Sequence, residues 1–182
     1  MSSRRRLGAC VVVAAFVTVG AGASGEKTPA AEWVRSLCTS IVDWGDGLAD
    51  ARDDEDVRAR NLEKRRTAIV SFLRQATDAT DTLLEDLDEA GTPDVPEGGR
   101  IRAAFRKGFK QARKAFARAR NDAKELDVDD RQEFEDAAED ISSAISRGGD
   151  RVDQTFTDAA EKYGSDELDE AYNAEPTCST VR

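Results

Sequence analysis

Apolar residues recur at intervals of three and four along most of this 182-residue chain, which is the spacing of one face of an α-helix. The apolar stripes cover residues 33–48, 62–87, 101–126, 134–163 and 168–172. No segment alternates between apolar and polar residues with a period of two, as a half-buried strand would. The sequence therefore predicts an all-α protein with four long helices and a short fifth one.

Residues typical of helix ends flank these stripes. Thr28 is expected to cap the first helix, and Gly91 is expected to end the second in the left-handed conformation. Asp130 with Glu133 forms a capping box at the start of the fourth helix, and Ser165 can cap the fifth. The segments between the long helices are short, so consecutive helices should lie antiparallel.

The expected architecture is an up-down-up-down four-helix bundle with a short C-terminal fifth helix. Large apolar residues are scarce and alanine is abundant, so the helices should approach each other closely. Gly108 and Gly148 would fall at the same level if the third and fourth helices turned near Asp127. We interpret them as a close contact or a kink, with a cavity as the weaker alternative.

The N-terminus has the pattern of an export signal. Arg4 to Arg6 are positively charged, residues 8–19 are apolar, and Ala21-Gly22-Ala23 is a small-residue cleavage pattern. We therefore expect residues 1–23 to be a cleaved signal peptide and residues 24–182 to form a single helical-bundle domain. The alternative is that the segment is retained as a membrane anchor, and the export route, general or twin-arginine, stays open.

Cysteine usage agrees with an oxidising compartment. Cys10 lies in the export signal, whereas Cys38 and Cys178 lie near the two ends of the expected mature chain. An even number of long helices returns the chain to the end where it began, so the fifth helix could bring Cys178 beside Cys38. We expect these two residues to form one disulfide, which in the chain-entropy model stabilises the fold by nearly 5 kcal/mol.

Charge is segregated along the chain. The net charge is −10, and loss of three arginines with the signal makes it about −13, which disfavours nucleic acid as a partner. The third helix is basic, and the segments on either side of it are acidic. The candidate surface for an anionic partner comprises Arg102, Arg106, Lys110, Arg113, Lys114 and Arg120.

A simpler interpretation is that these bases pair with acidic neighbouring helices. In an antiparallel hairpin, Arg118 and Arg120 would come level with Glu135 and Asp136. On the other side of the third helix, Lys107 would come level with Asp81.

The sequence shows no recognisable arrangement of catalytic side chains. The chain has no histidine, and pairing of the cysteines would leave carboxylates, lysines and hydroxyls as its reactive groups. The acidic runs at 53–56 and 127–130 lack the glycine and the glutamate of an EF-hand loop. We therefore expect no enzyme activity, no cofactor and no metal site. Trp33 and Trp44 are expected to be core residues, with a ligand-stacking platform as the alternative.

Three short motifs resemble those of small secreted helical proteins and lipoproteins of high-GC Gram-positive bacteria. They are Trp33-x3-Leu37-Cys38, the turn Gly91-Thr92-Pro93 and the terminal Pro176-Thr177-Cys178. The excess of arginine over lysine is also typical of such sources. The resemblance implies a disulfide-tied helical bundle at the cell envelope, without a particular activity. Many of those relatives carry a lipid-bearing cysteine at the end of the signal, and this chain does not.

Together these features predict a secreted, non-enzymatic interaction or structural protein of the cell envelope that acts through charged helical surfaces. Its partner would be another envelope or extracellular protein, or an anionic polymer or lipid head group. No membrane span is expected once the signal is removed. The alternative is an extracytoplasmic binding protein for a small apolar or anionic ligand.

Overall fold

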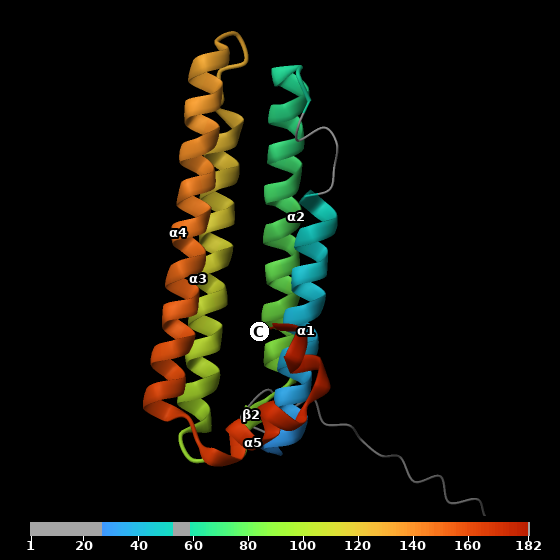
Figure 1. The fold of residues 1–182 in the computed structure, drawn as a ribbon, viewed down its shortest axis with the longest axis vertical. Helices are drawn as coiled ribbons and strands as arrows, with labels where there is room; N and C mark the ends of the chain where they lie inside the picture. Colours follow the sequence, from blue (N-terminus) through green and yellow to red (C-terminus); the bar gives the residue numbers. More distant parts are fainter. Residues whose placement is uncertain (1–26, 53–58, 182) are drawn as a thin grey trace, which may run out of the picture.

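The computed structural model describes residues 27–52 and 59–181, and these are predominantly helical (Figure 1). In chain order the elements are β1 (Lys27–Thr28), α1 (Ala30–Arg52), α2 (Leu62–Glu89), β2 (Thr92–Pro93), α3 (Gly98–Lys124), α4 (Arg131–Tyr163), α5 (Asp166–Ala174) and the 3₁₀ segment η2 (Pro176–Val181). The five predicted helices are confirmed. The predicted signal peptide, residues 1–23, and the acidic run at 53–56 lie outside the described residues.

Local sequence sets several of the helix ends as predicted. The Asp130 carboxylate accepts hydrogen bonds from the backbone amides of Gln132 and Glu133, at 2.8 and 3.1 Å. Ser165 caps α5 in the same way. These side chains satisfy amides that have no partner in the first turn of a helix. Gly91 follows α2 with a φ of 74°, a conformation that a residue without a Cβ adopts freely.

The N-terminal end of α1 differs from the prediction. Thr28 does not cap the helix, because its hydroxyl donates to the carbonyl of Ala90 at 2.8 Å. Thr28 and Lys27 instead form β1, which pairs in parallel with Thr92 and Pro93 of β2. The prediction of a purely helical chain is wrong here, since two-residue strands are too short to show an alternating pattern. This pairing holds the start of α1 against the segment that joins α2 to α3.

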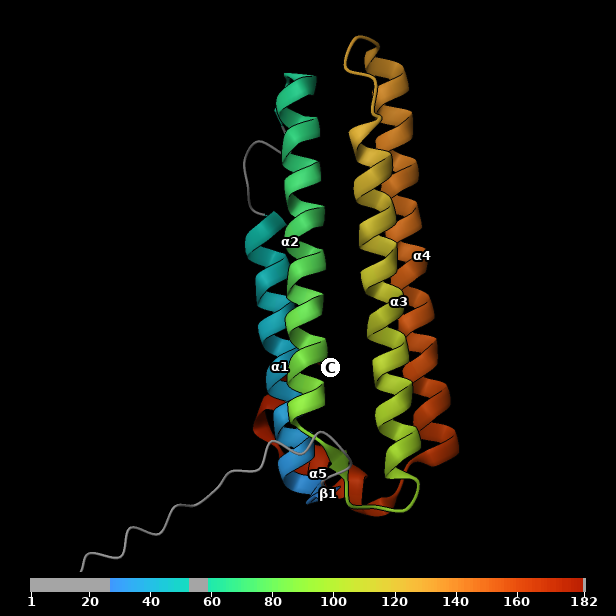
Figure 2. The ribbon, with the colours of Figure 1, turned by 180° about the vertical axis from the view of Figure 1, so that it is seen from behind.

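The long helices form two side-by-side pairs, α1 with α2 and α3 with α4 (Figures 1 and 2). Among the described residues, α2 packs on both α1 and α3, and α4 packs extensively on α3. The remaining side, between α1 and α4, has no comparable packing. The predicted closed four-helix bundle is therefore not confirmed: three helix interfaces are packed and the fourth side is open.

Helix length explains part of this opening. The α1 helix has 23 residues and α4 has 33, so at 1.5 Å per residue they span about 35 and about 50 Å. One apolar cluster, at the end of the molecule where α1 begins, combines α1, α2, α3 and α5. A second cluster, toward the other end, is built mainly from α2, α3 and α4. The chain thus has two adjoining cores, and Trp44 and Phe156 pack against both.

Both predicted helix glycines are close-contact points, but they do not lie at one level. A Cβ on Gly108 would lie 2.6 Å from Cε1 of Phe156, and one on Gly148 would lie 3.1 Å from Cβ of Ala115. The two glycines face different partners because the α3–α4 register is centred later in the chain than Asp127. The predicted close contact is confirmed and the predicted shared level is wrong.

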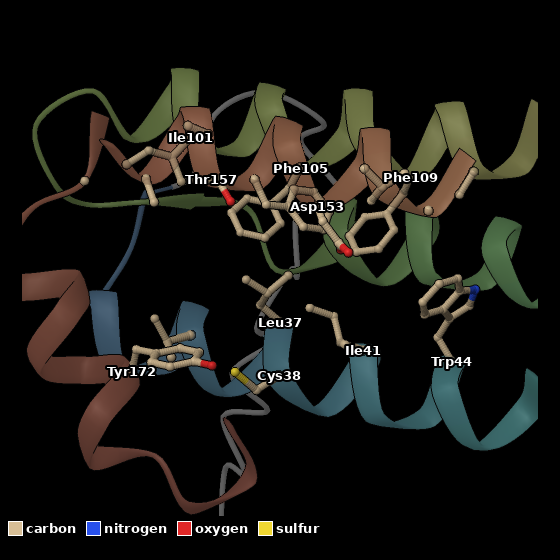
Figure 3. A pocket seen from close by; sticks show the side chains of 18 of the residues that line it. Leu37, Cys38, Ile41, Trp44, Ile101, Phe105, Phe109, Asp153, Thr157 and Tyr172 are labelled. Atoms are coloured by element: carbon tan, nitrogen blue, oxygen red, sulfur yellow. The ribbon is translucent and has the colours of Figure 1, made fainter. Parts of the chain in front are cut away.

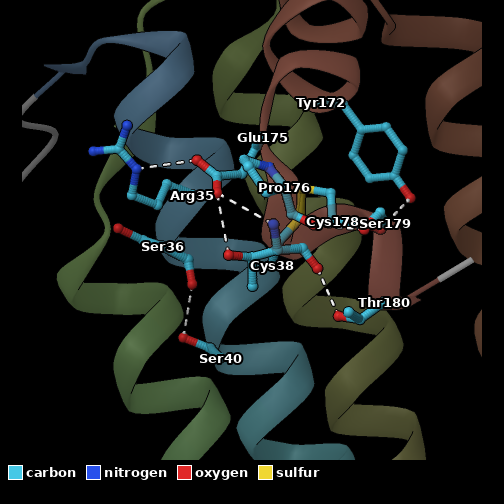
Figure 4. The surroundings of a disulfide bond; sticks show 11 residues. Arg35, Ser36, Cys38, Ser40, Tyr172, Glu175, Pro176, Cys178, Ser179 and Thr180 are labelled. Carbon is cyan, nitrogen blue, oxygen red and sulfur yellow. Dashed lines mark hydrogen bonds and ion pairs between the residues drawn. A yellow bond between two sulfur atoms is a disulfide. The ribbon is translucent and has the colours of Figure 1, made fainter.

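The predicted disulfide joins Cys38 of α1 to Cys178 of η2, with Cα atoms 5.1 Å apart and a sequence separation of 140 (Figure 4). Both cysteines are buried. The α5 helix and η2 both pack on α1, so the C-terminal segment lies along α1 and not along α4. The disulfide therefore fixes the end of the chain to the first helix.

Replacing both cysteines (Cys38→Ala with Cys178→Ala) should lower the free energy of unfolding by about 5 kcal/mol, because a loop of this length restricts the unfolded chain strongly. Urea denaturation of the variant and of the wild type, with and without reductant, measures the loss. Reduced wild type should match the double variant. Equal stability of the oxidised and the fully reduced, thiol-labelled protein would contradict the prediction.

Candidate functional site

An apolar cavity of about 630 Å³ occupies the open side of the helix array (Figure 3). Residues of α1, α3, α4 and α5 line it. We call it the α1–α4 cavity. A second hollow, of about 750 Å³, lies between the start of α1 and the end of α2, and its lining is mostly polar. The α1–α4 cavity is the one in which apolar side chains lack a covering helix.

The α1 wall is the predicted apolar stripe of the first helix. Leu37, Ile41 and Trp44 project from α1 toward the side chains of α3 (Figure 3). The indole nitrogen of Trp44 donates to the Thr80 hydroxyl at 3.0 Å, which fixes the ring against α2. Trp33 is 2% exposed and also lines the cavity, and its indole nitrogen has no hydrogen-bond partner among the described residues. The stripe was correctly predicted as apolar, but part of it faces a cavity.

The opposite wall is a cluster of phenylalanine rings on α3 and α4. Phe156 stacks on Phe105 with ring centroids 4.6 Å apart and tilts against Phe109 at 5.1 Å. Edge contacts to the two tryptophans, at 5.8 and 5.9 Å, connect this cluster to α1. The contact of the Phe156 ring with Gly108 sets how closely α4 approaches α3. The rings form a packed wall that needs no ligand to hold its shape.

Polar groups occur at the mouth of the cavity. Asp153 and Thr157 lie on α4 beside the aromatic wall, and both residues are exposed (Figure 3). Asp169 and Tyr172 lie on α5. Sequence reasoning did not single out these four residues, because the three polar ones lie beside apolar stripes and Tyr172 belongs to one. Nothing in the sequence pattern marks them as lining a cavity.

The disulfide borders the cavity, because Cys38 is one of the residues that line it. The hydroxyl of Tyr172 donates to the carbonyl of Cys178 at 3.5 Å. On the outer side, Arg35 of α1 donates to the Glu175 carboxylate at 3.0 Å (Figure 4). This bond and that from the Thr177 amide lower the pKa of Glu175 below its ordinary value. An ion pair therefore supports the covalent tie between α1 and η2.

Three of the six bases predicted to face an anionic partner are used inside the molecule. Arg102 and Arg106 both pair with Asp88 of α2, at 2.7 and 2.6 Å. Arg113 forms a two-pronged ion pair with Asp81 of α2, which raises the pKa of the guanidinium above its ordinary value. These pairs fix α3 beside α2, as the simpler interpretation of the charge pattern predicted.

The other three predicted bases, Lys110, Lys114 and Arg120, make no ion pair within residues 27–52 and 59–181. Both lysines are exposed.

The predicted pairings by level do not form. Asp81 pairs with Arg113 and not with Lys107, because α2 and α3 meet in another register. Glu135 of α4 is bonded at 2.6 Å by Arg65 of α2 and not by a base of α3. Arg65 also lies over the ring of Phe134, 5.3 Å from its centroid. An ion pair between α2 and α4 therefore lies beside the second apolar cluster, to which Phe134 belongs.

The site offers binding chemistry. The chain contains no histidine, and Cys38 and Cys178 are joined. No group of three or more potential metal ligands occurs among the described residues. No helix in that part of the chain is long and apolar enough to cross a membrane. What the cavity provides is an aromatic and aliphatic lining with two carboxylates at its mouth.

No family model, no curated protein and no solved structure matches this chain.

Glu175→Gln should destabilise the protein at neutral pH and not in acid. A carboxylate whose folded pKa is lowered stabilises the fold above its ordinary pKa of 4.5, and that contribution is lost as the pH falls through the folded pKa. Denaturation of wild type and variant at pH 7 and at about pH 2 measures the difference.

The matched control is Glu170→Gln, which removes an exposed carboxylate from α5. A wild-type advantage over Glu175→Gln that is as large in acid as at neutral pH would contradict the assignment.

Proposed function

We propose that this protein is an extracytoplasmic binding protein that holds one small apolar ligand in the α1–α4 cavity. The observation that carries the proposal is the cavity itself, about 630 Å³ and walled by aromatic and aliphatic side chains. Small-molecule sites typically have volumes of about 300 to 1,000 Å³, apolar linings and few polar groups, and are largely formed before the ligand arrives. The α1–α4 cavity has each of these properties.

Transfer of apolar surface from water supplies the driving force. A ligand that buries about 300 Å² of apolar surface gains roughly 7 kcal/mol at about 25 cal/mol per Å², before the cost of association is subtracted. The walls gain as well, because a ligand replaces water against the rings of Phe105, Phe156 and Trp44. Packed rings and the disulfide hold the walls in place, so little ordering is needed on binding.

The extracytoplasmic location is part of the proposal and is supported by three features. A disulfide buried between α1 and η2 is compatible with an oxidising compartment. The sequence also predicts a cleaved export signal at residues 1–23. The resemblance to small secreted helical proteins of high-GC Gram-positive bacteria agrees with this location.

A second candidate is the function predicted first from the sequence, an envelope interaction protein that acts through charged helical surfaces. It is supported by Lys110, Lys114 and Arg120 of α3, which have no ion-pair partner among the described residues. We place it second because Arg102, Arg106 and Arg113 are occupied by Asp88 and Asp81. The remaining bases could still contact an acidic protein, an anionic polymer or lipid head groups.

The neutral fluorescent probe N-phenyl-1-naphthylamine should bind in a saturable, one-to-one manner. The only two tryptophans, Trp33 and Trp44, line the cavity, so energy transfer from them to the probe reports occupancy of this site. Gly149→Phe should weaken binding by about tenfold or more, because Gly149 lines the cavity and a Cβ there has open space around it.

Gly45→Phe is the matched control, since Gly45 is an exposed helix glycine with equal space that does not line the cavity. It should leave probe binding unchanged. Absence of saturable binding to the folded wild type, or equal binding to both variants, would refute the proposed site. If the wild type binds the probe as expected, native mass spectrometry of the exported protein can identify a ligand that co-purifies with it.

A further inference from the structure

The charged groups that line the α1–α4 cavity are all of one sign. Asp153 of α4 and Asp169 of α5 line it, and no lysine or arginine of the described chain does. Neither aspartate forms an ion pair with another described residue. Both residues are exposed, so their carboxylates keep their water while the cavity is empty. The mouth of the apolar site therefore carries negative charge without a partner.

Each carboxylate has an aromatic neighbour on its own helix. Asp153 is three residues before Phe156, and Asp169 is three residues before Tyr172, so each pair shares one helix face. All four residues line the cavity. A carboxylate beside aromatic faces is the combination that attracts alkylammonium groups, through charge and through the negative face of the ring. Two such pairs, on α4 and α5, therefore border one apolar space.

We infer that the ligand is a small cationic amphiphile, with its apolar part among the phenylalanine rings and an ammonium group at the edge of the cavity beside Asp153 or Asp169. This inference rests on the proposed function and specifies its ligand class. An anionic head group would be repelled by these like charges, and a neutral one would lack the Coulombic attraction that a cation has to them. The net charge of −10 on the whole chain also attracts cations to the protein.

The volume argues for a small molecule and against a helix of a partner protein. A space of about 630 Å³ bounded by α5 at one end suits a single chain or ring system. Helix-in-groove recognition needs anchor positions over several turns of an amphipathic helix. The aromatic wall is instead concentrated around Phe105, Phe109 and Phe156.

The test compares three probes with one tail and different heads: decyltrimethylammonium, decyldimethylamine oxide and decanoate, each below its micelle concentration. Displacement of N-phenyl-1-naphthylamine from the full chain at low salt gives their relative affinities. The cation should bind about fivefold more tightly than the amine oxide, as expected for one or two exposed charge contacts, and decanoate should bind most weakly.

The double variant Asp153→Asn with Asp169→Asn should lose the preference for the cation and keep its affinity for the amine oxide. Asp150→Asn with Glu170→Gln is the matched control, because it removes two exposed carboxylates from the same helices that do not line the cavity. The control should keep the preference, because neither of its side chains borders the space in which the ammonium group would lie.

Equal or tighter binding of the amine oxide or decanoate to the wild type would overturn the inference and leave the apolar binding site standing. Loss of the cation preference in both double variants alike would also overturn it, because the effect would then come from net charge. Failure of N-phenyl-1-naphthylamine itself to bind would refute the proposed function.

Discussion

The covalent bond between Cys38 and Cys178 determines which surface of α1 is covered. It joins segments 140 residues apart and places η2, with α5 before it, against the first helix. The tied segment also closes one end of the space between α1 and α4, because α5 residues line the cavity there. The open side of the array is thus bounded at one end by the segment that the disulfide holds against α1.

Charge contributes to the same arrangement from the other side of α3. The guanidinium of Arg113 engages Asp81, and Asp88 receives two further arginines, so the outer edge of α3 is committed to α2. The edge of α3 that carries Phe105 and Phe109 is then directed to the interior and the cavity. One side of α3 therefore forms ion pairs with α2, and another packs its aromatic rings against α4. No base of α3 lines the cavity, so the negative charge at its mouth has no cation beside it among the described residues.

Periodicity was sufficient to predict the helices, and the positions of the two cysteines were sufficient to predict their bond. Periodicity alone could not distinguish an apolar stripe that faces a helix from one that faces a cavity, because Leu37 and Ile41 would be apolar in either setting. Ion-pair partners depend on register, and a shift of somewhat less than two helical turns was enough to pair Asp81 with Arg113 and not with Lys107. The pairing of Lys27 and Thr28 with β2 is a backbone interaction of two residues, too short for any sequence period. The type of each element follows from the local sequence, whereas the cavity depends on how several helices pack together.

The attachment of α4 has a consequence for selectivity. One wall of the cavity, α1, is fastened by a covalent bond, and the other, α4, rests extensively on α3 alone among the described helices. The separation of the two walls is therefore set by the contact of α4 with α3, through side chains such as Phe156 against Gly108. A change of side-chain volume at that contact would therefore alter the width of the cavity, although the substituted residue, such as Gly108, does not line it.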